Sequence, residues 1–185
     1  MHGDVMPTGH AEAETPAVVT RPVTAESYKA AFRRHPGGVA VVTADPGDGP
    51  VALTLTSLTS VNLDPPLLAF SLSHASSAAA AMLRASTVVV HLLDVRHLEI
   101  AKLGASSGVD RFADRRIWTR LPGGEPLFHS VTNWLRCRVA HRLEVGGATL
   151  MICEVLETGE SADEERTPLV YQDRAWFRLE SGARL

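Results

Sequence analysis

Residues Leu53–Leu67 read L-T-L-T-S-L-T-S-V-N-L-D-P-P-L, and this stretch decides the fold. Threonine and branched apolar residues favour extended backbone, so we expect one strand from Val51 to Val61 that ends before Pro65 and Pro66. The dense hydroxyls have two readings. They are the wet face of an ordinary edge strand, or they join exposed N–H and C=O groups in facing a flat polar ligand.

Patterns typical of strands continue on both sides of this stretch. Further strands are expected at residues 39–43, 67–73, 87–93, 134–143, 148–156, 169–171 and 175–179. Helices are expected from Thr24 to the Pro36 break, over 76–85 with Ser76 or Ser77 as N-cap, and after Asp94. Residues 104–126 have no clear pattern. Seven or so strands with few helices predict a mainly β fold, a small antiparallel barrel with helices packed outside it.

The composition excludes several classes of protein. The 185 residues are 45% hydrophobic and 21% charged, as in a globular domain. A net charge of -3 and a pI near 6.2 argue against a nucleic-acid partner. No apolar run is long enough to span a membrane and no secretion signal begins the chain, so we expect no membrane partner and a cytoplasmic location. Residues 1–22 are predicted to be a disordered arm before one domain at 23–185.

Signatures of the common catalytic and metal sites are missing from the sequence: there is no HExxH, P-loop, GxGxxG after a strand, or GxSxG. We therefore expect no metal site. Cys137 and Cys153 are predicted to be buried strand residues rather than a disulfide. Four histidines are interpreted as surface or loop residues: His35, His97, His129 and His141.

His91 is different because it interrupts the apolar run of residues 87–93. A polar side chain there must find a partner, so His91 is either a core histidine bonded to backbone or a ligand contact. The run Ser71-Leu-Ser-His-Ala-Ser-Ser77 leads into the expected helix at 76–85. Hydroxyls and free N–H groups at a helix N-terminus suit a phosphate, although serine is also simply a common N-cap.

Several separated motifs resemble those of the flavin reductase family. Residues 35–43 (H-P-G-G-V-A-V-V-T) are similar to the family's P-T-G-V-x-V-V-T, and residues 53–67 to its M-T-x-S-S-F-T-S-V-S-L-D-P-P-L. The match continues in order at residues 73–77, 88–93, 110–112 and 168–171. The resemblance implies a homodimeric, Greek-key FMN-binding split β-barrel with FMN or FAD at the subunit interface.

The resemblance also implies site residues, position by position. The flavin ring edge and ribityl chain would run along five consecutive residues: Thr54, Leu55, Thr56, Ser57 and Leu58. The flavin phosphate would be bound by Ser73, Ser76 and Ser77. Gly37 replaces the family's Thr and Leu58 its Phe, but flavin binding relies mainly on backbone groups and hydroxyls.

The remaining implied site residues surround the flavin ring. His91 replaces the family's usual Asn and would lie beside the flavin with Leu92, which makes His91 the one candidate catalytic residue. Arg111 and Phe112 would close the site, and Trp176 would cover it from the last strand.

The implied activity is NAD(P)H-dependent reduction of FMN or FAD, with the reduced flavin supplied to a partner monooxygenase. The hydride chemistry belongs to the cofactors, so no side chain need act as acid or base. Two alternatives stay open: a flavoprotein oxidoreductase or oxidase acting on another small molecule, and a non-catalytic flavin-binding protein.

One departure from the family concerns the nicotinamide substrate. Family reductases commonly carry G-D-H-T in the hairpin after the strand at 134–143, and that His is associated with NADH or NADPH. Here residues 146–149 read Gly-Gly-Ala-Thr, so both the Asp and the His are absent. We therefore expect NAD(P)H oxidation to be slow or absent compared with relatives that carry Asp and His in this hairpin.

Overall fold

The computed structural model describes residues 20–159 and 166–180, so residues 1–19 of the expected arm lie outside the described part. The helices are α1 (Ala25–Arg33), α2 (Ala79–Arg84), the 3₁₀ turn η1 (Val95–His97) and α3 (Leu98–Ala105). The strands are β1 (Gly37–Gly38), β2 (Ala40–Ala44), β3 (Val51–Leu55), β4 (Thr59–Asn62), β5 (Leu67–Ser73), β6 (Thr87–Leu92), β7 (Trp118–Arg120), β8 (Pro126–Phe128), β9 (Trp134–Val145), β10 (Ala148–Gly159), β11 (Leu169–Gln172) and β12 (Ala175–Arg178). The predominance of antiparallel strands confirms the expected mainly β fold.

The main sheet has seven strands and is rolled rather than flat. Its order is β3-β2-β6-β9-β10-β5-β4, so β3 and β4 are the two outer strands. Six spacings of about 4.8 Å would place those strands about 29 Å apart in a flat sheet. Yet only Thr56, Ser57 and Leu58 join them, and the four Cα–Cα steps from Leu55 to Thr59 span at most about 14 Å. The two edges are therefore close, with residues 56–58 crossing the split between them.

The rolled sheet has a core on each face. Alternate residues of β2 and β6 contribute to an inner cluster with Phe70, Leu72, Met82 and Met151. The other face of the same strands packs with Ala101 of α3 and with Phe112, Trp118 and Phe128. Because both faces of β2 and β6 are covered, these strands read as nearly continuous apolar runs, as the sequence predicts for residues 87–93.

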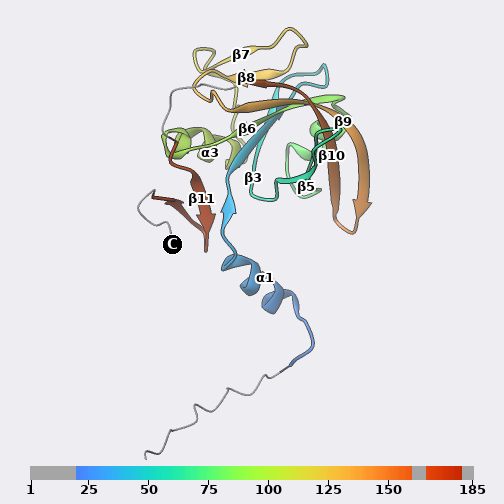
Figure 1. Ribbon diagram of the computed structural model, residues 1–185, viewed down its shortest axis with the longest axis vertical. Coiled ribbons are helices and arrows are strands. Elements are labelled where there is room, and N and C mark those ends of the chain that lie inside the picture. The colour runs from blue at the N-terminus through green and yellow to red at the C-terminus, as the bar shows by residue number, and fades with distance from the viewer. Residues whose placement is uncertain (1–19, 160–165, 181–185) are drawn as a thin grey trace, which may run out of the picture.

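A second, three-stranded sheet is formed by β1, β11 and β12. Backbone hydrogen bonds from Val39 N–H to Leu169 C=O and from Leu93 N–H to Val39 C=O tie it to the main sheet. Helix α1 precedes β1 and projects away from the body beside β11 (Figure 1). No residue of α1 is buried.

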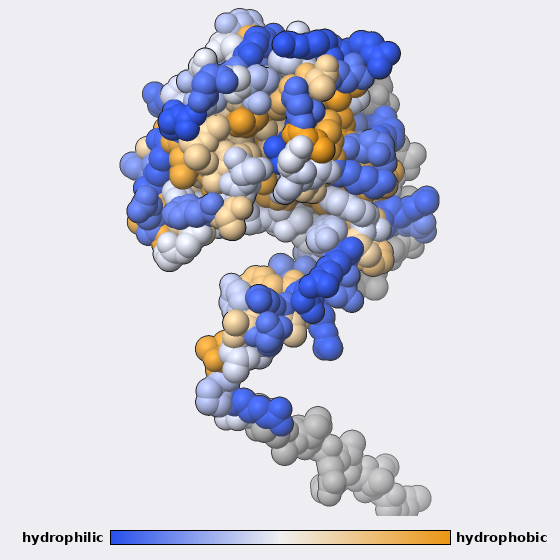
Figure 2. Space-filling model, turned by 180° about the vertical axis from the view of Figure 1, so that it is seen from behind, coloured by the Kyte–Doolittle hydropathy of each residue, from blue (hydrophilic) through white to orange (hydrophobic). Residues whose placement is uncertain are grey.

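Large apolar side chains remain on the surface of the described chain. They include Tyr28 and Phe32 of α1, and Leu63, which is 89% exposed at the end of β4. Figure 2 shows hydrophobic atoms gathered on the face of the body seen from behind. Within the described residues, no helix has the length and apolar character needed to cross a bilayer.

Three expectations about secondary structure are wrong in detail. The single strand expected at Val51–Val61 is two strands, because the chain must leave one edge of the sheet and join the other. The region 104–126, which has no clear sequence pattern, contains β7 and the start of β8, and these two short strands pair with each other. The helix expected over 76–85 begins only at Ala79, and its N-cap Ala78 makes no side-chain cap.

Candidate flavin site

The segment Thr56–Leu58 connects the two outer strands of the rolled sheet. It lies outside the registers of both β3 and β4, since the β3 pairing ends at Leu55 and the β4 pairing begins at Thr59. Thr56 and Ser57 are exposed and Leu58 is half-buried. Ser57 is held by its hydroxyl, which accepts from Ser71 N–H at 3.0 Å and donates to Ser71 C=O at 3.3 Å.

The residues just before this segment hold it in place. The Thr54 hydroxyl donates to the Ala101 carbonyl of α3 at 2.6 Å, and Leu55 is buried in the inner core. A Cβ built on Gly37 would lie 2.8 Å from the Thr56 Cβ. Glycine at position 37, where the family has Thr, therefore lets β1 approach Thr56 closely. Of the five residues expected along the flavin, Thr56 and Ser57 are exposed, Leu58 is half-buried against the inner cluster, and Thr54 and Leu55 anchor the segment.

Two aromatic residues form a hollow beside this segment. Trp176 of β12 and Tyr171 of β11 pack with ring centroids 4.7 Å apart. Together with Thr54, Leu55, Thr56 and Ala105 they line a hollow of about 210 Å³. Trp176 is thus next to the expected flavin residues, as its predicted role requires.

Leu58 and Leu92 border two further hollows. One, of about 210 Å³, is completed by β1, β2 and Leu169. The other, of about 310 Å³, is lined by polar residues of β4 and by apolar residues that include Leu67 and Leu68 of β5, Leu135 and Val155. Leu92 therefore lies at the candidate site.

The serines expected to bind phosphate lie in and after β5. Ser73 and Ser77 are exposed, and the hydroxyls of Ser73 and Ser76 accept from backbone N–H groups two residues later. The prediction that Ser76 or Ser77 caps a helix is wrong, because α2 begins at Ala79. Their hydroxyls structure the β5–α2 turn.

His74 in that same turn is a residue whose position sequence reasoning missed. Its side-chain Nε2 lies 2.8 Å from the Thr149 hydroxyl, and its backbone N–H donates to the Gly147 carbonyl at 3.0 Å. An imidazole is therefore present beside the Gly146-Gly147 hairpin, although it comes from the β5–α2 turn. Only the register of β5 against β10, which opposes Ser73 and Ala148, reveals this proximity.

His91 is an interior residue with backbone partners on both ring nitrogens. Its side chain is fully buried; Nδ1–H donates to the Val41 carbonyl and Nε2 accepts from the Phe128 N–H, both at 3.1 Å. Those partners fix the neutral tautomer, because a carbonyl can only accept and an N–H can only donate. Burial lowers the pKa of His91 to about 4. The alternative of a core histidine bonded to backbone is the correct one.

Phe112 is also an interior residue rather than a lid. It is 4% exposed, stacks on Phe128 at 5.5 Å and meets Trp118 edge-on at 5.0 Å. Its neighbour Arg111 is half-buried and donates to the Ser106 carbonyl. The Arg111 Nε is buried with no partner in the described chain. Phe112 thus packs the loop between α3 and β7 against the hydrophobic cluster that contains Phe128 and Trp118, and Arg111 is positioned by that loop.

The other histidines and the cysteines agree with expectation except for His97. His35, His129 and His141 are exposed. His97 is buried instead, because it completes the capping box of η1 with Asp94 and its Nε2–H donates to the Ser130 carbonyl at 2.8 Å. Cys137 and Cys153 are both buried, as predicted.

A flavin fits these features. An isoalloxazine ring needs a flat surface with hydrogen-bonding groups along one edge. The backbone of Thr56–Leu58 is not paired with a neighbouring strand, and the side chains of Thr56 and Ser57 are exposed. The hollows at Trp176 and at Leu58 supply apolar surface next to the segment. No group of three metal-ligating side chains occurs within residues 20–159 and 166–180.

Comparisons with known proteins identify the family of this chain. The family model described as "Flavin reductase like domain" matches residues 32–180. The NADH:FMN oxidoreductase of Rhodococcus qingshengii is 38% identical over an alignment of 178 residues that covers 92% of this chain and 93% of that protein. Among solved structures, the Streptomyces globisporus C-1027 NADH:FAD oxidoreductase SgcE6, in complex with NAD and FAD fragments, aligns with a TM-score of 0.79 and 25% identity over 91% of this chain and 100% of its own.

A third relative works within a two-component system. BorF, the flavin reductase component of a bacterial two-component tryptophan halogenase, aligns with a TM-score of 0.74 and 28% identity, covering 84% of this chain and 98% of its own. The family match spans both outer strands of the rolled sheet and the segment between them. This chain belongs to the flavin reductase like domain family.

Proposed function

We propose that this protein is an NAD(P)H-dependent flavin reductase that binds FMN or FAD at the Thr56–Leu58 segment. The observation that carries the proposal is that segment, which crosses the split between the outer strands and borders two hollows. The relatives named as NADH:FMN and NADH:FAD oxidoreductases support the same activity.

The chain's own residues have binding and positioning tasks. When bound, the flavin supplies the hydride-accepting ring. Thr56, Ser57 and Leu58 would hold one edge of the ring, and Trp176 and Leu92 would bound the hollows beside it. Both cysteine thiols are unreactive, because burial raises the pKa of each to about 12. The absence of an acid or base at the segment suits a reaction whose proton and electron chemistry the two cofactors supply.

The serines of the β5–α2 turn are proposed to bind the flavin phosphate. Hydroxyls of Ser73, Ser76 and Ser77 lie within one turn of chain, and Ser71 of the same strand is bonded to Ser57. The turn is therefore linked directly to the segment proposed to hold the ring.

The active species is proposed to be a homodimer located in the cytoplasm. Leu63 and Val61, beside the Leu58 hollow, are 89% and 52% exposed, and α1 buries none of its residues. Large apolar side chains left exposed in this way are typical of an interface. A second subunit there would close the open side of the candidate site and exclude water from it.

The reduced flavin is proposed to serve a separate flavin-dependent monooxygenase or halogenase. BorF acts as the reductase component of such a pair. The open hollows around Thr56–Leu58 would allow flavin to leave after reduction.

The test is steady-state oxidation of NADH and NADPH by the purified protein, with and without added FMN or FAD. We expect oxidation that depends on added flavin and saturates with it. Binding of flavin without any NAD(P)H oxidation would leave only a flavin-binding role.

A further inference from the structure

We propose that the pocket between α1 and the β11–β12 turn binds the adenylate half of a dinucleotide. The inference rests on the proposed function, since both FAD and NAD(P)H carry an adenylate. The pocket encloses about 420 Å³ and is lined by residues of α1, His35, Thr56 and residues 171–174. That volume falls in the range of small-molecule sites, about 300–1,000 Å³.

Two hydrogen bonds build the pocket by fixing α1 to the turn. The Asp173 N–H donates to the Arg33 carbonyl at 2.8 Å, and the Gln172 side-chain amide donates to the Arg34 carbonyl at 2.7 Å. They satisfy carbonyls at the C-terminal end of α1 that the helix itself leaves unpaired. Asp173 and Arg174 adopt positive φ values of 46° and 63°, which turn the chain sharply there. The wall formed by the turn is therefore held in one place relative to the helix.

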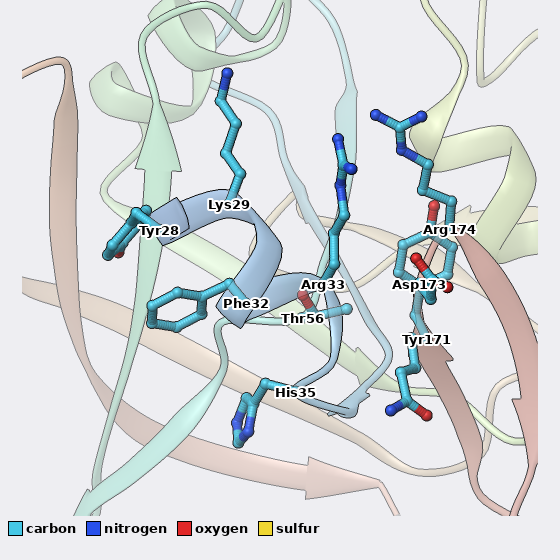
Figure 3. Close-up of a pocket in the computed structure, with 10 residues that line it drawn as sticks. Tyr28, Lys29, Phe32, Arg33, His35, Thr56, Tyr171, Asp173 and Arg174 are labelled. Atoms are coloured by element: carbon cyan, nitrogen blue, oxygen red, sulfur yellow. The ribbon is translucent and has the colours of Figure 1, made fainter. Parts of the chain in front are cut away.

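The pocket is cationic although the protein is acidic overall. Its lining includes Lys29, Arg33 and Arg174 against the single carboxylate of Asp173. In Figure 3 the side chains of Lys29, Arg33 and Arg174 extend in the same direction. Neither guanidinium has a hydrogen-bond or ion-pair partner in the part of the chain that the structure describes, whereas Lys29 is bonded to Glu26 at 3.3 Å. Two unpaired guanidiniums on one side favour a multiply charged oxyanion such as a pyrophosphate.

Aromatic rings lie on the same pocket. Tyr28 and Phe32 pack with ring centroids 4.7 Å apart, and both are 58% exposed. A purine base stacks favourably on such rings. Cations for phosphate together with aromatic faces for a base match an adenylate better than a simple anion.

The pocket also adjoins the candidate flavin site. Thr56 and Tyr171 line both this pocket and the hollow beside Trp176. One extended ligand can therefore place its ring at Thr56–Leu58 and its adenylate against α1. This continuity separates the pocket from an isolated basic surface.

The direct test measures binding of ADP by calorimetry, without any turnover. We expect the double variant Arg33→Gln with Arg174→Gln to raise the ADP dissociation constant about tenfold or more, because two charge-assisted hydrogen bonds are lost. The matched control is Arg34→Gln with Arg178→Gln. It removes the same charge from neighbouring exposed residues that do not line the pocket, and it should leave ADP affinity unchanged. Circular dichroism should show both variants folded.

Two further arms identify which dinucleotide uses the pocket. A rise in the FAD dissociation constant relative to that of FMN assigns the adenylate to the flavin. A rise in KM for NADH or NADPH in assays with FMN assigns it to the nicotinamide cofactor. The inference is overturned if ADP, FAD and NAD(P)H all bind the double variant as they bind wild type, or if the control loses affinity equally. Because ADP binding needs no reaction, a failed reductase assay leaves this result interpretable, and an unchanged ADP affinity leaves the reductase proposal standing.

Discussion

At the scale of single residues, His91 joins two sheets. It sits in β6, donates to β2 through Val41 and accepts from β8 through Phe128. Protonating Nε2 would set a donor against the Phe128 N–H, so the structure holds the ring neutral.

Folding stability should therefore depend on pH through His91. The folded pKa is about 4 against an ordinary value of 6.5, so the unfolded chain binds more protons between these values. The stabilisation is fully present above pH 6.5 and is lost as the pH falls toward 4. His91 alone should reduce the unfolding free energy by about 2 kcal/mol between pH 7 and pH 5.

Denaturant unfolding of wild type and His91→Asn at the two pH values measures this effect. Between pH 7 and pH 5 the unfolding free energy of the variant should fall by about 2 kcal/mol less than that of wild type. It should also be less stable at pH 7 by about 1–3 kcal/mol, because asparagine cannot reach both backbone partners. An NMR titration of His91 with a pKa near that of a solvated imidazole would contradict the account.

Phosphate binding by the β5–α2 turn is testable with two flavins. Replacing Ser76 and Ser77 with alanine should weaken FMN binding by about 1–3 kcal/mol, since two hydrogen bonds to a charged group are lost. Riboflavin lacks the phosphate, so its affinity should not change. Equal losses for FMN and riboflavin would instead point to a collapsed turn, and no loss would place the phosphate elsewhere.

At the scale of elements, the β9–β10 hairpin offers a test of nicotinamide use. The lack of the family's Asp and His predicts slow NAD(P)H oxidation by wild type. A Cβ added to Gly147 meets nothing within 4 Å, so the hairpin can accept Gly147→Asp with Ala148→His. This double variant should oxidise NADH faster by one to three decades, equivalent to a few kcal/mol of transition-state stabilisation.

The same assay should include His74→Ala. His74 already places an imidazole beside the hairpin. Fast turnover by wild type that falls in His74→Ala would show that this imidazole replaces the missing one. Fast turnover unaffected by either change would refute the importance of the hairpin side chains.

Most strands were predictable from sequence because their patterns are local. The strand at 67–73 has the expected bounds, and Asp94 caps the expected helical segment. The break at Thr56–Leu58 was not predictable, since threonine and leucine favour strand on both sides of it. What breaks the strand is the closure of the sheet, which no local window contains.

The sequence predicted the part of the candidate site that lies on an exposed segment of the chain. Thr56 and Ser57 are exposed, and their contact with a flavin stays a prediction. The contacts of His91 with Phe128 and of Phe112 with Trp118 were not predictable, because the sequence around β7 and β8 has no clear pattern. The cations of the α1 pocket come from residues about 140 positions apart, which only the folded chain brings together.

At the scale of the whole molecule, the exposed apolar surface predicts a dimer. Light scattering after size exclusion should give twice the mass of one chain. Leu63→Asp should shift the protein toward monomer, because a charge would have to be buried in the interface. Flavin affinity should fall with it if the second subunit completes the site.

Thr119→Asp is the control for that experiment. Thr119 is an exposed residue of β7, in the separate two-stranded sheet, and the change should leave the mass unaltered. A monomeric wild-type protein that reduces flavin normally would show that the flavin site does not need a second subunit.

The most direct test of flavin reduction is anaerobic stopped-flow mixing of the flavin-loaded protein with NADH or NADPH. The account predicts that the absorbance of oxidised flavin is lost in a protein-dependent step whose rate saturates with nicotinamide. With Thr56 and Ser57 replaced by alanine, flavin should bind more weakly and less of it should be reduced at the same concentration. Retained oxidised flavin after mixing with either nicotinamide, in protein shown to bind flavin, would contradict the central claim.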